Sequence, residues 1–242
     1  MQSICYSTLV EPTSVFVEED IEMTFQVALV GSNGIVVASD RKIAYQTRER
    51  SDRPWDRQTS VGPKFACKDD NSIVCFFAGG SQAISIANAV VCQVDASTPN
   101  ISDWHSQLER AANSVIAKST ADEVMVVRPF VGDVTLIYKS ASEPSVSSIP
   151  DRRCTGIIAK CRFLTELFWR ESTVSELRRL ALILLHFAST ERPESVGGGY
   201  DLLIVENGKV KWEKEKPLDS EEVQELVLKF SRAIDQSIFS SA

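Results

Sequence analysis

This 242-residue sequence lacks the features that mark several common classes of protein. No apolar run approaches the roughly 18–20 residues that a membrane-spanning helix needs, so we expect a soluble protein with no membrane partner. The net charge of −7 argues against nucleic acid as a partner, because nucleic-acid binding requires a basic surface. The two histidines and six cysteines show no CxxC pair and no zinc-ligand spacing. We therefore expect no metal, no cofactor, and reduced cysteines in a cytoplasmic protein.

The first 22 residues contain no lysine or arginine, although they hold five acidic side chains. They account for −5 of the net charge of −7, which leaves −2 for the remainder. A secretory signal begins with a basic segment and a transit peptide is rich in arginine, so this leader is neither. We expect an acidic leader over residues 1–23, either a propeptide or a wrongly assigned start, and one domain over residues 24–242.

Apolar residues recur at strand spacing and at helix spacing in an order that repeats along the chain. The expected strands are 24–30, 35–39, 64–67, 72–77, 124–127, 134–138, 146–149, 154–156, 200–205 and 210–212. The expected helices are 81–94, with Ser81 as its cap, 102–117, 157–170, a helix capped by Thr173 or Ser175 that runs to Ser189, and 220–238. The polar stretch 46–63 predicts a long surface loop. Strands followed by helices, twice over, predict two stacked sheets with helices outside.

Thr24 is the strongest candidate for a catalytic residue, because it opens a strand directly behind Met23. If the peptide bond before Thr24 is broken, one residue carries both a nucleophilic hydroxyl and an α-amine that can take its proton. Such an amine has a pKa of about 7.7–8, so a useful fraction is neutral at cellular pH. In the uncut chain the amine is locked in a peptide bond and Thr24 is inert.

Three further residues complete a candidate site. Asp40 ends the strand after Thr24, and Lys64 precedes the next hairpin. A lysine beside Asp40 either stays protonated and lowers the pKa of the threonine hydroxyl, or loses its water and shuttles the proton itself. Gly79, at the end of the following strand, offers a backbone N–H for a tetrahedral oxyanion.

These motifs and their order resemble those of a proteasome β-type subunit, a proteasome-like N-terminal-nucleophile (Ntn) hydrolase, over residues 24 to about 215. Thr24 stands ten residues ahead of Gly34, Asp40 stands six residues after Gly34, and Lys64 lies in Gly62-Pro63-Lys64. The resemblance implies an α+β fold: a four-layer αββα sandwich of the Ntn-hydrolase type, with two antiparallel sheets between helix layers. It also implies a homo-oligomeric ring that cleaves peptides or unfolded proteins and has a regulatory ATPase as a further partner.

The resemblance assigns a substrate pocket and a supporting group to particular positions. Ile43 and Phe77 stand where the family lines its specificity pocket, which predicts a small or apolar residue on the acyl side of the cut bond. Where the family has a serine after Thr155-Gly156, this sequence has Ile157. Near the last hairpin, Glu194 stands in for the family's acid, and Ser195 replaces its serine if the loop shifts.

Three functions remain open from the sequence. The first is a threonine-type endopeptidase, the second is a structural ring subunit without catalysis, and the third is a transpeptidase that passes the same acyl-enzyme to an amine. The sequence has no Gly-x-Ser-x-Gly elbow to suggest a serine hydrolase instead. Thr24 is freed either by autocatalytic removal of the leader or by loss of Met23 from a chain that starts there, and we favour the second route.

Overall fold

The computed structural model describes residues 20–22, 25–47, 56–116, 122–140, 143–155 and 172–239. Met23, Thr24, the leader up to residue 19 and the helix expected over 157–170 lie outside the described residues. Helices and strands both contribute to the fold, so the α+β prediction is confirmed.

One five-stranded sheet is built around the hairpin predicted for the segment after Thr24. Its central strands are almost continuously apolar because both of their faces are buried. All neighbouring strands run antiparallel. In order across the sheet they are β11 (Arg152–Thr155), β2 (Gln26–Val30), β3 (Gly34–Asp40), β12 (Tyr200–Glu206) and β13 (Lys209–Lys216).

A second five-stranded sheet contains the hairpins predicted on either side of the first two helices. Its strands are also antiparallel. In order they are β10 (Ser145–Ile149), β9 (Asp133–Lys139), β8 (Asp122–Arg128), β7 (Val74–Ala78) and β6 (Phe65–Cys67). The predicted strands are therefore confirmed wherever the structure describes them.

A third, three-stranded sheet corrects the prediction of a loop over 46–63. β4 (Lys42–Thr47) continues the chain after β3 and pairs with β5 (Asp56–Val61) on one edge and with β1 (Asp20–Glu22) on the other. The sequence of β5 is polar, so it lacks the alternation that marks a half-buried strand. Backbone pairing with β4 makes it a strand all the same.

Four helices are described: α1 (Ser81–Gln93), α2 (Ile101–Asn113), α4 (Val174–Glu191) and α5 (Glu221–Phe239). The expected cap at Ser81 is wrong, since the N-cap of α1 is Gly80 and no side chain caps it. The alternative Thr173 is right for α4, where it forms a capping box with Glu176. Among the described residues, no helix combines the length and apolar character needed to cross a membrane.

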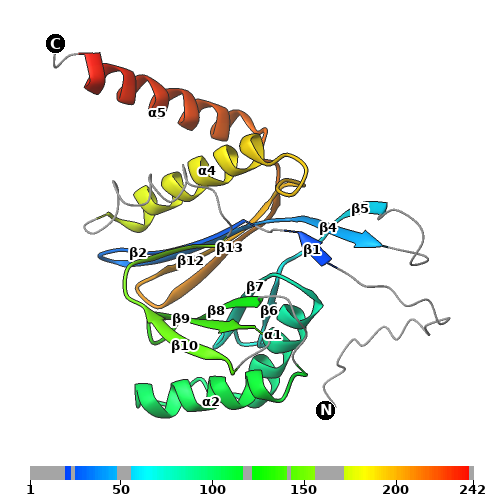
Figure 1. Cartoon of the computed structure of the whole chain (residues 1–242). Coiled ribbons are helices and arrows are strands. Elements are labelled where there is room, and N and C mark those ends of the chain that lie inside the picture. Colours follow the sequence, from blue (N-terminus) through cyan, green and yellow to red (C-terminus); the bar gives the residue numbers. More distant parts are fainter. Residues whose placement is uncertain are drawn as a thin grey trace.

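The core consists of three apolar clusters. One lies between the two five-stranded sheets and includes Ala28, Val37, Phe76 and Met125. A second joins β2, β3 and β12 to α4 and α5, and a third joins the other sheet to α1 and α2. Figure 1 shows the same order, with α4 beside the first sheet and α5 on the far side of α4, α1 and α2 beside the second sheet, and the β4–β5 hairpin extending to one side.

Candidate active site

Asp40 and Lys64 form an ion pair that is almost fully buried. Asp40 is the last residue of β3, and Lys64 immediately precedes β6 in the other sheet. The Lys64 Nζ lies 2.8 Å from the Asp40 Oδ1, and the two side chains are 3% and 0% exposed. The structure therefore brings together two residues that are 24 positions apart and that the sequence analysis assigned to one site.

Three backbone N–H groups also donate to the Asp40 carboxylate. Phe25 donates to Oδ1 at 3.0 Å, while Lys42 and Gly197 donate to Oδ2, each at 3.0 Å. A buried charge is tolerated only where it is paired and hydrogen-bonded, and four donors meet that need here. Asp40 thereby joins the start of β2, the start of β4 and the loop after α4.

Burial shifts the pKa values of both partners toward their neutral forms. Loss of water raises the pKa of Asp40, although Lys64 and the backbone donors oppose this shift. The same loss of water lowers the pKa of Lys64 from its ordinary value of 10.5, and the charge of Asp40 opposes that shift. A lysine with a lowered pKa moves its proton more readily at neutral pH than a solvated one.

Phe25 connects this pair to the position of Thr24, which itself lies outside the described residues. Phe25 follows Thr24 in the chain, and its backbone exchanges hydrogen bonds with Asp40: the Phe25 N–H donates to the carboxylate, and the Phe25 carbonyl accepts from the Asp40 N–H at 3.2 Å. The next residue, Gln26, donates from Nε2 to the Phe77 carbonyl at 2.6 Å. Hydrogen bonds thus join Phe25 to Asp40, and Gln26, the first residue of β2, to β7.

Gly79 lies directly after β7, close in sequence to this junction. The Phe77 N–H donates to the Lys64 carbonyl at 3.1 Å, so the end of β7 is tied to the lysine backbone. Gly79 has φ +114°, a conformation that L side chains rarely adopt. The next N–H, of Gly80, donates to the Asp122 Oδ1 at 2.7 Å. This turn requires glycine and is fixed by a buried carboxylate.

Ile43 and Phe77, the predicted pocket residues, have different surroundings. Ile43 lies on β4, and its Cδ1 lies 3.3 Å from the position that a Cβ would take on Gly62. Phe77 is half-buried and packs against the cluster of α1 and α2. The pocket that these two side chains would line remains a prediction.

Glu194 and Ser195, the predicted support for the amine, lie in the loop between α4 and β12, and this support remains a prediction. Glu194 is exposed, and its Oε1 lies 3.8 Å from Arg192. Ser195 is buried, and its N–H donates to the Arg192 carbonyl at 3.0 Å. The residue of this loop that reaches Asp40 is Gly197, through its N–H. The run of three glycines at 197–199 was its only signal in the sequence.

Among the described residues, no three His, Cys, Asp or Glu side chains gather closely enough to hold a metal ion. The described site offers an amine, a carboxylate and backbone N–H groups.

Solved structures of Anbu proteins share the arrangement of the sheets and helices. The Anbu (Gly-1) mutant from Hyphomicrobium sp. strain MC1 has a TM-score of 0.66 and 19% identity, over 89% of this chain and 96% of its own. Anbu (ancestral β-subunit) from Yersinia bercovieri has a TM-score of 0.66 and 14% identity, over 90% and 97%. The helical assembly of the Anbu complex from Pseudomonas aeruginosa gives 0.62 and 15%, over 89% and 95%.

The sequence comparisons add nothing to this likeness. No protein-family model matches the chain, and no curated protein matches it significantly. At identities below 20%, the structural likeness concerns the fold and leaves the activity to be argued from the site.

Proposed function

We propose that this chain is a proteasome-like threonine-type endopeptidase that cleaves peptides or unfolded proteins. The observation that carries the proposal is the buried Asp40–Lys64 pair, which is hydrogen-bonded to the residue that follows Thr24. Apolar side chains of similar volume often stabilise a core at least as well as a buried ion pair does. The presence of this pair next to a threonine therefore favours a chemical role. The four-layer αββα arrangement belongs to the same proposal, and the three apolar clusters support it.

The proposed reaction begins with attack of the Thr24 Oγ on a peptide carbonyl. The α-amine of Thr24 accepts the hydroxyl proton, and the Oγ–C bond forms. The Gly79 N–H stabilises the oxyanion, an interaction worth roughly 3–4 kcal/mol in comparable sites. The C–N bond then breaks, the leaving amine takes the proton, and an ester remains on Thr24.

Water completes the cycle by hydrolysing this ester. The Thr24 amine takes a proton from the water, the water oxygen bonds to the acyl carbon, the C–Oγ bond breaks, and the proton returns to Oγ. Lys64 acts on both steps, either by its charge or by relaying the proton, while Asp40 holds it in place. If an amine replaces water in this step, the product is a new peptide bond, as in the transpeptidase alternative.

Self-assembly forms a second part of the proposal. The Anbu complex from Pseudomonas aeruginosa forms a helical assembly, and the fold likeness supports an oligomer of this chain also. We propose a homo-oligomer, which encloses the sites and restricts cleavage to peptides and unfolded chains. Native mass spectrometry and electron microscopy distinguish a closed ring, a helix and a monomer, and a monomer at micromolar concentration contradicts this part.

The decisive experiment compares the full chain with a protein that begins at Thr24, prepared by cutting a removable tag. Intact mass verifies each N-terminus. We expect the protein that begins at Thr24 to hydrolyse fluorogenic peptides and to gain the mass of a threonine-directed covalent inhibitor. Thr24→Ala abolishes both, whereas Thr24→Ser keeps part of each because it retains a hydroxyl. A verified Thr24 terminus that shows neither property contradicts the proposal.

A structural subunit without catalysis is the competing function, and one observation favours it. β1, which lies just ahead of Thr24 in the sequence, pairs antiparallel with β4, as expected of a segment that stays in place. A protein purified from its natural source that retains residues 20–22 and still assembles supports this function over the enzyme.

A further inference from the structure

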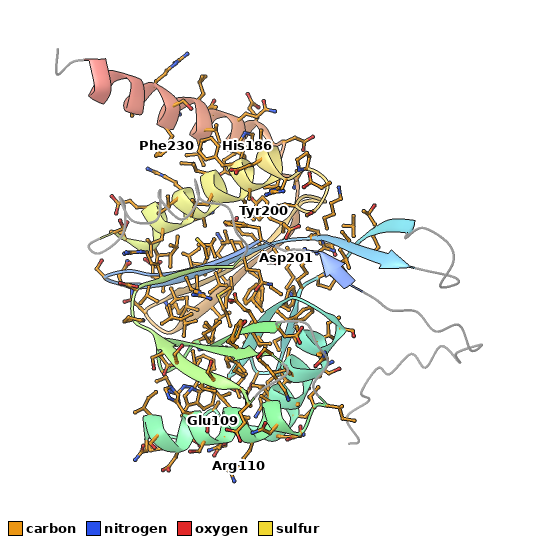
Figure 2. The ribbon with its side chains drawn as sticks, viewed as in Figure 1. Glu109, Arg110, His186, Tyr200, Asp201 and Phe230 are labelled. Carbon is orange, nitrogen blue, oxygen red and sulfur yellow. The ribbon has the colours of Figure 1, made fainter. Side chains whose placement is uncertain are left out.

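A second buried ion pair lies directly beside the first. Arg41 follows Asp40 in the chain, and its Nη1 donates to both carboxylate oxygens of Asp201, at 2.9 and 2.8 Å. The side chains of Arg41 and Asp201 are 10% and 0% exposed. The Arg41 Nη2 also donates to the Glu215 Oε1 at 3.1 Å. Figure 2 shows Asp201 at the end of the sheet where the β4–β5 hairpin departs, with Tyr200 on the side of α4.

The backbone of Arg41 holds the glycine loop 197–199. Its N–H donates to the carbonyls of Gly197 and Gly199, at 3.0 and 3.2 Å, and its carbonyl accepts from the Gly62 N–H at 2.9 Å. The Gly197 N–H in turn donates to the Asp40 Oδ2. One residue of the loop is therefore bound on both sides, by Arg41 at its carbonyl and by Asp40 at its N–H.

The other side of the loop packs tightly against β13. A Cβ on Gly199, where φ is +89°, would lie 2.7 Å from the Lys216 carbonyl oxygen. Glu215, the preceding residue of β13, donates from its N–H to the Asp201 Oδ1 at 2.8 Å. Asp201 thus fixes both the Arg41 side chain and the strand against which the loop rests.

We propose that Arg41 and Asp201 are positioning residues, which hold the loop 197–199 so that the Gly197 N–H meets the Asp40 carboxylate. The catalytic part of this inference rests on the proposed function. Arginine suits the task because its planar fork binds one carboxylate through two hydrogen bonds and has further donors for a second, which lysine cannot match. The Arg41 side chain, held by Asp201, fixes the backbone whose N–H donates to both carbonyls of the loop that reaches Asp40.

Three variants test the proposal. Arg41→Lys keeps the charge and loses the fork, and Asp201→Asn keeps the shape and loses the charge. Because removal of one partner leaves the other buried and unpaired, the double variant Arg41→Met/Asp201→Leu supplies an apolar replacement that folds more readily. The matched control is Arg128→Lys, which weakens the pair between another buried arginine and the half-buried Asp133 at the β8–β9 turn.

The first measurement is amide hydrogen exchange over residues 193–200 in the full chain, and it needs no activity. We expect at least about tenfold faster exchange at Gly197 in all three variants, since the loop no longer holds this N–H in line with the Asp40 carboxylate, and no change there in Arg128→Lys. If the role of Arg41 and Asp201 is purely structural, the melting temperature changes in the test and control variants alike. The exchange rate at Gly197 then stays close to that of the parent protein. That second result overturns the proposal.

The second measurement is kinetic and uses proteins that begin at Thr24. Misplacement of catalytic groups by about 1 Å costs roughly 100-fold, so we expect kcat to fall by about that factor with little change in KM. A weakened N–H bond to Asp40 also moves the acidic limb of the pH profile to higher pH, because the carboxylate binds its proton more readily. If a variant exchanges faster at Gly197 but keeps the kcat and the pH profile of the parent, the catalytic part of the proposal is overturned. Inactivity of the parent contradicts the proposed function and leaves positioning to be decided by exchange.

Discussion

The Asp40–Lys64 pair is where single residues matter most, because both charges are removed from water. In Lys64→Met, the Asp40 carboxylate stays buried without a cation, and loss of one partner from a buried pair typically costs about 3–5 kcal/mol. Asp40→Asn/Lys64→Met no longer buries that charge. We therefore expect the double variant to be more stable than Lys64→Met alone, with a coupling energy above about 1 kcal/mol. Urea denaturation of the four proteins in this cycle measures it.

An exposed lysine–glutamate pair on α5 is a suitable control for that cycle. Lys229 and Glu225 lie 3.0 Å apart and both are well exposed. Lys229→Met and Glu225→Gln should each change the free energy of unfolding by no more than about 0.5 kcal/mol, with weak coupling. Equal coupling energies in the two pairs would show that burial of Asp40 and Lys64 has no energetic consequence.

Motif order that resembles a proteasome β-type subunit predicted that Asp40 and Lys64 share one site, and the structure places the two side chains in contact. The sequence did not predict Gly197, which is 157 residues from Asp40, or Asp201, which is 160 residues from Arg41. Gly197 contacts Asp40 through its backbone N–H, and glycine has no side chain that could indicate this partner in the sequence. A buried arginine looks the same in sequence as a solvated one until the pairing of β3 with β12 brings its acceptor close.

At the scale of elements, α4 depends on the capping box at its start. The Thr173 side chain accepts from the Glu176 N–H, and the Glu176 carboxylate accepts from the Thr173 N–H at 2.7 Å. We expect Thr173→Ala to lower the free energy of unfolding by about 1 kcal/mol. Thr190→Ala, an exposed change near the end of the same helix, should stay within about 0.5 kcal/mol. Thermal and urea denaturation give both values.

The pH dependence of the same cap has a defined sign. The hydrogen bond from the Thr173 N–H lowers the pKa of Glu176 below its ordinary value of 4.5. The folded state therefore binds this proton less readily than the unfolded state, so the stabilisation is present above pH 4.5 and is lost as the pH falls through the lowered value. Glu176→Gln should cost stability near pH 7 and progressively less in acid. A cost that grows in acid contradicts the assignment.

The sequence predicted the helices and strands that side chains determine. It did not predict those that backbone pairing with another segment determines. The capping residues of α4 and the apolar runs of β2, β3 and β12 have direct signatures in the sequence. The strand β5, which reads Asp-Arg-Gln-Thr-Ser-Val, has none, and β4 provides its hydrogen-bond partners. The N-cap of α1 was missed for a related reason, because Gly80 is fixed by Asp122 from a distant strand.

For the whole molecule, the alternation of side chains explains the packing order. In β2, Val27 and Leu29 belong to the cluster with α4, whereas Ala28 between them belongs to the cluster between the sheets. Stacked sheets with outer helices follow from such a pattern. The approach of β1 to β4 does not, because the three residues Asp20–Glu22 are too few to show an alternating pattern.

The pairing of β1 with β4 leads to a prediction for the whole chain. Residues before Thr24 are the acyl side of the bond that would be cut, and Asp20–Glu22 run antiparallel to Ala44–Gln46. An extended substrate can add to the same sheet edge once β1 is removed. Amides of β4 should therefore exchange faster in the protein that begins at Thr24 than in the full chain, and a bound peptide inhibitor should restore their protection. The β12–β13 pair serves as an internal reference that stays constant. Equal exchange in β4 with and without residues 1–23 would mean that this edge is not held by β1, and an inhibitor that binds without protecting β4 would place the substrate elsewhere.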